Sequence, residues 1–189
     1  GSDYRFPLPP GWQALRLPER LEMAGAMNAA WKANPGYKWY GLLTDGVHPM
    51  TRGWDRLMVA AAGERNMASC DDGWRGGRRM GGIVLFPGWM LEALGWWVLP
   101  GLVHLYMDAV WEHLGFALGN WVYVPSVRCD YRHHANGRVP PDESNKRSLN
   151  GMPYTRPDQD RYNAWLRAGP AADLARVRGK WEAMKGEPW

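Results

Sequence analysis

The sequence predicts an α/β protein in which helices cover a central sheet. Amphipathic helical segments alternate with short apolar strands, and 189 residues suffice for one sizeable core. The order helix, strand, helix, strand, strand, helix, strand favours a three-layer α/β/α sandwich with a mixed, mostly parallel sheet. We therefore predict an α/β domain over residues 1–150, followed by a C-terminal helical extension over 151–189.

The first part of the chain carries clear helix and strand signals. Glu19 to Asn34 has apolar residues at helical spacing, and Asn34-Pro35-Gly36 should end that helix. Strands are expected at Tyr37–Leu43 and Met67–Cys70, on either side of a helix that runs from Thr51 or Arg52 to Ala62.

The remaining elements follow a glycine-rich and arginine-rich segment. Asp71–Gly82 holds five Gly and three Arg, which indicates an exposed, mobile loop. Beyond it, the pattern predicts strands at Ile83–Phe86 and Trp121–Val127, a short helix to Leu94, and helices at Leu105–Leu118, Asp158–Leu166 and Ala171–Met184.

Composition narrows the function classes. The net charge of +4 suits a phosphate-bearing ligand, but no nucleic-acid-binding module is recognisable, so no nucleic-acid partner is expected. Pro and Gly interrupt the most apolar stretch, Ile83–Leu105, so no membrane span is expected. Two Cys do not make a disulfide framework, which favours reduced thiols in a cytoplasmic protein. Thirteen Trp favour a ligand with flat faces, although each ring is also a good core residue.

Three groups of polar residues stand where ligand chemistry is common. Asp45 follows the strand that ends at Leu43, Asp108 lies in the first turn of a predicted helix, and His133 and His134 follow the last strand. Carboxylate oxygens and imidazoles hold a divalent cation that bridges a diphosphate, and a carboxylate can also act as a general base.

Each group also has a purely structural interpretation. Asp45 could cap a turn, Asp108 could stabilise its helix, and the two histidines could form a solvated pair. Asp71-Asp72 is interpreted as a polar turn. Cys129 with the two histidines lacks a recognisable zinc-ligand spacing.

The order of these segments resembles that of family-2-like glycosyltransferases of the GT-A fold, which use nucleotide-diphospho-sugars. The resemblance spans about residues 19–143. It is carried by the helix Arg20–Asn28, by Tyr40–Pro49, by Thr51–Asp55, by Pro87–Trp96, by His104–Asp108, and by the His133-His134 segment that ends at Gly137.

The resemblance implies a role for each candidate. Asp45 falls on the motif that holds Mg²⁺ or Mn²⁺ against the donor diphosphate, and Asp108 on the base that deprotonates the acceptor hydroxyl. His133 or His134 falls where a further metal ligand is expected. Asn28 falls on the helix near the donor. Trp96 and Trp97 fall in the loop that shapes the site of a carbohydrate or other hydroxyl acceptor.

The chain departs from the family pattern at two places. Gly46 stands where a second acidic residue is expected, and only residues 1–18 precede the first helix, where the family has a nucleotide-binding β-α-β unit. A partner chain or oligomer completing the site is one explanation. Two alternatives stay open: a non-catalytic GT-A-like binding or structural module, and a metal-dependent hydrolase that uses Asp45, Asp108 and a histidine.

Overall fold

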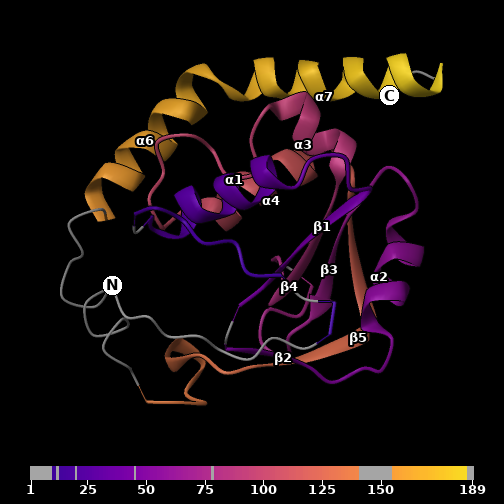
Figure 1. Cartoon of the computed structure of the whole chain (residues 1–189), viewed down its shortest axis with the longest axis vertical. Coiled ribbons are helices and arrows are strands. Elements are labelled where there is room, and N and C mark those ends of the chain that lie inside the picture. The colour runs from indigo at the N-terminus through magenta and orange to yellow at the C-terminus, as the bar shows by residue number, and fades with distance from the viewer. Residues whose placement is uncertain are drawn as a thin grey trace.

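The protein contains a five-stranded mixed sheet with helices packed around it (Figure 1). The computed structural model describes residues 10–11, 13–19, 21–44, 46–77, 79–140 and 155–186. The strands are β1 (Trp39–Leu43), β2 (Val47–Pro49), β3 (Met67–Asp71), β4 (Ile83–Pro87) and β5 (Trp121–Tyr131). The helices are α1 (Met23–Ala33), α2 (Trp54–Ala62), α3 (Gly88–Leu94), α4 (Met107–Leu118), α6 (Thr155–Ala168) and α7 (Pro170–Lys185), with a 3₁₀ turn, η1 (His134–Asn136).

The strand order is β1-β4-β3-β5-β2, and most of the pairing is antiparallel. β4 runs antiparallel to both β1 and β3, β2 runs antiparallel to β5, and only β3 and β5 are parallel. The predicted α/β class and mixed sheet are confirmed, but the predicted predominance of parallel strands is wrong. A parallel pair needs a crossover connection, whereas β3 reaches β4 through a loop and therefore returns antiparallel.

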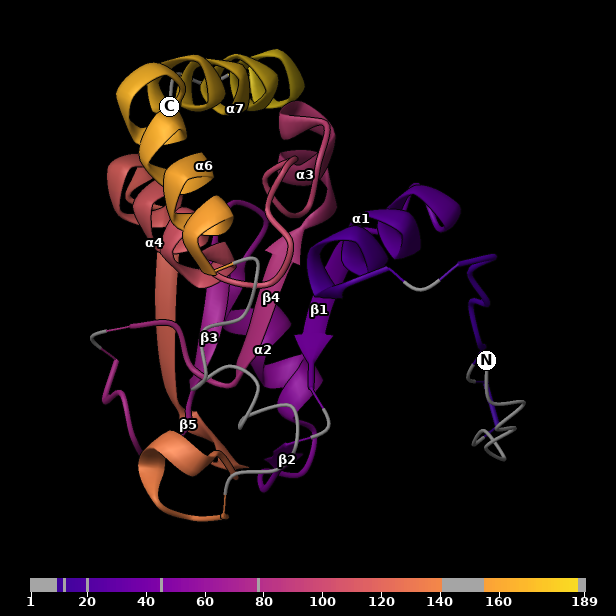
Figure 2. The same ribbon diagram turned by 90° about the vertical axis from the view of Figure 1, so that its left-hand side faces the viewer.

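β5 is longer than the sequence pattern predicts. Its first part pairs with β3, the register shifts between Cys70 and Asp71, and its last residues pair with β2. This irregularity bends the strand away from β3 and forms a two-strand ribbon at the far end of the sheet. A regular three-layer sandwich is therefore not confirmed (Figure 2).

Alternate residues of β4 face two separate apolar clusters, as a strand buried on both faces requires. Val84 and Phe86 belong to the larger cluster, which collects residues of α1, α3 and α4. Ile83 and Leu85 belong to the smaller cluster, which includes Met58 of α2. β4 is thus covered by different helices on its two faces.

The C-terminal helices are part of the main core. Trp165 of α6 and Val177 of α7 are buried in the larger cluster, and the Trp165 indole donates a hydrogen bond of 2.7 Å to Asp173. Trp181 packs against Trp89 of α3 with ring centroids 5.3 Å apart. The predicted boundary near residue 150 therefore separates segments whose described parts share one core.

Asp158 of α6 is a buried carboxylate whose hydrogen bonds all go to the backbone before α4. It is 0% exposed, and its two oxygens accept the backbone N–H groups of Val103, His104 and Leu105 at 2.7–2.9 Å. A buried charge is tolerated when its oxygens are saturated with donors in this way. Asp158 consequently fixes the backbone that leads into α4.

No helix in the described ranges is long and apolar enough to cross a membrane.

Replacing Asp158 tests how strongly α6 holds this segment. Asp158→Asn keeps the shape but points an amide N–H₂ group at backbone donors, which should lower the free energy of unfolding by about 3 kcal/mol. Asp160→Asn, on the exposed side of the same helix, should change it by less than about 0.5 kcal/mol. Urea denaturation of both variants measures the difference, and equal midpoints would contradict the structural role.

Glu64 forms exposed ion pairs with two lysines that are far apart in the sequence. Its carboxylate contacts the ammonium groups of Lys38 and Lys185, and these lysines lower the pKa of Glu64 from 4.5 to about 2. A lowered folded-state pKa adds stability above about pH 4.5, and this contribution is lost as the pH falls toward 2.

We expect Glu64→Gln to remove that part of the acid dependence. The wild-type protein should be more stable than the variant at pH 6, and the two should converge by pH 2. Because the ion pairs are exposed, 1 M salt should also shrink the difference. Urea midpoints measured against pH and salt provide the check; a constant gap at all pH values would contradict the pKa shift.

Candidate functional site

A cavity of about 300 Å³ opens where the sheet meets the start of α4. Its volume is at the lower end of the range for small-molecule sites, roughly 300–1,000 Å³. One wall is the loop between β3 and β4, a second is the segment that Asp158 holds, and the third is the end of β5. The polar and aromatic lining residues are Thr44, Trp74, Arg75, His104, Tyr106, Asp108, Trp111, Tyr131 and His133.

The loop after β3 begins with a hydrogen-bonded turn and is anchored by buried residues at both ends. Asp72 is 1% exposed, and its Oδ1 accepts the N–H groups of Trp74 and Arg75 at 3.0 and 2.8 Å. The interpretation of Asp71-Asp72 as a polar turn is thereby confirmed. The expected exposure of the loop is confirmed at Trp74, whereas Asp72, Met80 and Gly81 are buried and anchor the segment on the strand ends.

Arg75 is positioned by this turn. Its Nη1 donates to Asp72 Oδ2 and to the Met80 carbonyl, both at 3.2 Å. Among the described residues, neither Nε nor Nη2 of Arg75 makes a hydrogen bond. Because Arg75 lines the cavity, these N–H groups suit a phosphate or carboxylate oxygen.

Three rings form an aromatic shelf in the cavity wall: Trp74, Tyr131 and His133. His133 stacks on Tyr131 at 5.4 Å and on Trp74 at 6.3 Å, and the Arg75 guanidinium lies 4.8 Å from the Trp74 ring centre. Trp74 is 44% exposed although its neighbours hold it in place. A preset, partly open indole is a suitable surface for stacking a sugar or a base.

His133 is placed by the turn that follows β5. Its Nδ1 accepts the N–H of Ala135 at 3.2 Å, so the neutral ring carries its proton on Nε2. A metal-bound imidazole usually does the reverse and donates from the nitrogen that does not bind the metal. In this arrangement Nε2 is a hydrogen-bond donor rather than a metal ligand.

His134 does not complete a metal site. Its ring centroid lies 4.3 Å from that of His133, but its Nδ1 is buried without a hydrogen-bond partner. The cavity-lining residues do not include His134.

Asp108 lies in the first turn of α4 and lines the cavity. Its Oδ1 accepts the N–H of Ala109 at 2.9 Å, and the side chain is exposed. The positive end of the helix dipole stabilises a negative charge at this position. The structure thus brings two of the predicted residues, Asp108 and His133, to one cavity.

The residue at the start of α4 is strained. Tyr106 is the one described non-glycine residue with positive φ, at 64°, and it lines the cavity. Its ring stacks on Tyr162 of α6 at 5.2 Å, which helps to hold this conformation. Strained backbone of this kind concentrates at functional sites, where it presets the geometry of nearby side chains.

Glu112, one turn after Asp108, supports the cavity from behind. It accepts the N–H of Met80 at 2.9 Å, and its second oxygen lies 3.5 Å from Arg79 Nη1. Burial raises the pKa of Glu112, and these two contacts oppose the rise. Glu112 therefore ties the β3–β4 loop to α4.

Asn28 has a structural role that the family resemblance did not suggest. Its Nδ2 donates to the Val98 carbonyl at 2.8 Å, and its Oδ1 accepts the N–H groups of Trp97 and Val98 at 2.9 and 3.0 Å. The amide is thus occupied in holding the loop after α3. Asn28 does not line the cavity, and its predicted position beside a donor stays a prediction.

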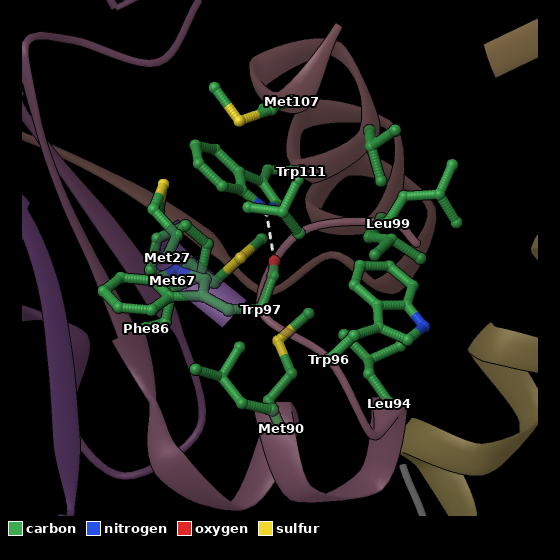
Figure 3. Close-up of a cluster of buried hydrophobic side chains, with 14 of the residues drawn as sticks. Met27, Met67, Phe86, Met90, Leu94, Trp96, Trp97, Leu99, Met107 and Trp111 are labelled. Carbon is green, nitrogen blue, oxygen red and sulfur yellow. Dashed lines mark hydrogen bonds between the residues drawn. The ribbon is translucent and has the colours of Figure 1, made fainter. Parts of the chain in front are cut away.

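Trp96 and Trp97, which were predicted to shape the acceptor site, are buried and do not line the cavity. Both are 6% exposed and belong to the larger cluster. Trp97 packs on Phe86, and its carbonyl accepts the Trp111 indole N–H at 2.9 Å (Figure 3). Burying these two large rings in the core removes more apolar surface from water than exposing them in a binding site would.

The predicted metal centre does not assemble from the described residues. Asp45 lies outside them, and no group of three His, Cys, Asp or Glu side chains in the described ranges could hold a metal ion. Asp72 uses its oxygens within the turn, and the Nδ1 atoms of both histidines face the protein. The described residues alone therefore do not provide the ligands that Mn²⁺ or Mg²⁺ requires, and the predicted metal site stays a prediction.

The sequence contained a signal for the residues that were missed. A carboxylate after a buried strand drew attention to Asp45, and Asp71-Asp72 follow the buried run Met67–Cys70 in the same manner. The same rule therefore points to the segment that contains Trp74 and Arg75, directly after Gly73. No local signal marks Tyr106, whose conformation depends on α6.

Comparison with known proteins yields no match: no family model, no curated protein and no solved structure is similar to this chain.

Proposed function

We propose that this protein transfers a sugar from a nucleotide-diphospho-sugar to an acceptor hydroxyl. The observation that supports this most is the shared cavity, in which the Asp108 carboxylate accompanies the Arg75 guanidinium and the aromatic shelf. An anion-binding group, a stacking surface and a potential base are the elements that such a transfer requires. The order of segments that resembles the family-2-like glycosyltransferases supports the same proposal.

The donor would be held through its rings and its phosphates. The exposed part of the Trp74 ring offers stacking to a base or sugar ring, while Nε and Nη2 of Arg75 offer N–H groups to phosphate oxygens. Arg75 is pinned by Asp72, so little conformational entropy is lost when it binds.

Asp108 would act as the base. As the acceptor oxygen attacks the anomeric carbon, the carboxylate takes the hydroxyl proton while the bond from sugar to diphosphate breaks. The departing negative charge is then stabilised by the donors that hold the diphosphate. A divalent cation, Mn²⁺ or Mg²⁺, remains part of the family expectation, but we derive no step through it because the described residues contain no group of three metal-binding side chains.

The proposal retains a cytoplasmic location, where two unlinked thiols are expected.

A non-catalytic binding module is the second candidate. It is favoured by Asp72, whose oxygens are occupied by the turn and by Arg75. Such a module would keep the aromatic shelf as a carbohydrate-binding or nucleotide-binding surface without chemistry.

Donor binding is tested by thermal shift. The protein is heated with UDP-, GDP- and dTDP-sugars, each with and without Mn²⁺, because a ligand of the native state raises the midpoint by mass action. A response to one donor, with transfer to an added acceptor, supports the enzyme. A response without transfer supports the binding module, and no response to any donor contradicts both.

Asp108→Asn separates chemistry from binding. Losing the base should lower the transfer rate by about 10²–10⁴-fold, with donor affinity nearly unchanged. Asp55→Asn is the matched control, since Asp55 is an exposed first-turn carboxylate on α2 and does not line the cavity. Single-turnover rates and calorimetry give the two quantities. Loss of binding with an intact fold would contradict the base role.

Trp74→Ala tests the aromatic shelf. Removing the indole should weaken donor binding about tenfold, or ~1.4 kcal/mol, in line with the energy of stacking one ring. Phe116→Ala is the control, because Phe116 is 58% exposed and lies on the part of α4 that does not line the cavity. Calorimetric Kd values provide the measurement; unchanged affinity would mean that the ring ligand binds elsewhere.

A further inference from the structure

Two cysteines from neighbouring strands meet beneath the cavity. The Sγ atoms of Cys70 on β3 and Cys129 on β5 are 3.2 Å apart and share a hydrogen bond. This separation exceeds a disulfide bond, about 2.05 Å, by little more than 1 Å. The residues are 59 positions apart in the sequence, so only the fold brings them together.

The sulfurs are held in place by a close-packed loop. Cys70 is 1% and Cys129 6% exposed. A Cβ on Gly81 would lie 2.1 Å from the Cys70 carbonyl oxygen, and one on Gly82 would lie 3.2 Å from Cys129 Sγ. Glycine is required at position 81, where a Cβ would overlap backbone, and a Cβ at position 82 would make a tight contact, so the loop packs closely over both sulfurs.

We propose that Cys70 and Cys129 form an oxidation site that closes an intrachain disulfide when a peroxide is the oxidant. One thiolate attacks a peroxide oxygen, the O–O bond breaks, and the sulfur becomes a sulfenic acid as water leaves. The second thiolate attacks this sulfur, the S–S bond forms, and the S–O bond breaks to release a second water. The two sulfurs are oxidised and the two peroxide oxygens are reduced, with the thiol protons taken up by the waters.

The shared hydrogen bond favours this reaction. It lowers the pKa of Cys70, because the Cys129 thiol stabilises the Cys70 thiolate, and it raises the pKa of Cys129. One sulfur of the pair is therefore biased toward the nucleophilic form, and its partner lies within reach to resolve the sulfenic acid.

A small oxidant has a route to the pair. Cys129 lines a second cavity, of about 420 Å³, together with Gly73, Arg128 and Arg138. Hydrogen peroxide is small enough to enter it, whereas bulky thiol reagents should react slowly while the protein is folded.

The cross-link would act at a structurally sensitive point. The register of β3 against β5 shifts between Cys70 and Asp71, immediately before the Asp71-Asp72 turn that positions Arg75. Gly81 and Gly82, which lie over the sulfurs, also line the candidate site. Disulfide formation would fix this bulge and the floor of the cavity, and it does not depend on the proposed sugar transfer.

The test treats the full chain with a small excess of hydrogen peroxide under native conditions. The protein is then denatured, alkylated and analysed by intact mass and non-reducing peptide mapping. We expect a loss of two hydrogen masses, no alkylated cysteine, a cross-linked Cys70–Cys129 peptide, and full reversal by dithiothreitol. The melting temperature should rise by an amount on the order of 5 °C, because the cross-link restricts the unfolded chain.

Three results would overturn the proposal: two alkylated cysteines after oxidation, stable addition of oxygen to either sulfur, or covalent dimers. Cys70→Ser and Cys129→Ser serve as controls, since each leaves one thiol and should show neither the intrachain loss of hydrogen nor the rise in melting temperature. The decisive measurement uses the wild-type protein, so it does not depend on how well either variant folds.

Discussion

The hydrogen bonds of Asp158 are the constraint on which the candidate site depends. One buried carboxylate on α6 accepts three consecutive backbone N–H groups, at Val103, His104 and Leu105, and so determines where α4 begins. On the opposite side, the Val103 carbonyl accepts the N–H of Ala24 at the start of α1. The segment before Asp108 is thus held from two helices that are more than 120 residues apart in the sequence. Without α6, the strained Tyr106 would lose its stacking partner, and Asp108 would lose its fixed position.

The tryptophans show how packing competes with function for the same residue type. Trp97, Trp111 and Trp165 are buried in the larger cluster, and their rings fill space between helices and sheet. Trp74 differs because the Asp72 turn lifts it onto the end of the sheet, where one face contacts Arg75 and part of the ring stays open. Composition alone cannot separate these cases, since an indole is equally suited to a core and to a stacking surface.

A second theme is that polar side chains hold backbone in place around the cavity. Asn28 holds the loop after α3, Asp72 holds the loop after β3, and Glu112 connects the latter to α4. Each of these groups resembles a ligand-binding residue when the sequence is considered alone. Their hydrogen bonds are satisfied within the protein, which leaves Arg75 and Asp108 as the polar groups best placed to meet a ligand.

The sequence by itself determined the α/β class, most helix and strand positions, and the presence of Asp108 and His133 at element ends, because hydrophobic periodicity and turn residues act locally. Helix α1 ends at Ala33, just before Asn34-Pro35-Gly36, and α4 ends at Leu118, both as predicted. Only the tertiary structure decided the antiparallel pairing, the hydrogen bonds of Asn28, the burial of Trp96 and Trp97, and the contact between Cys70 and Cys129. Those outcomes depend on which distant segments pack together. The free energy gained by burial between distant segments does not produce a periodic pattern in the local sequence.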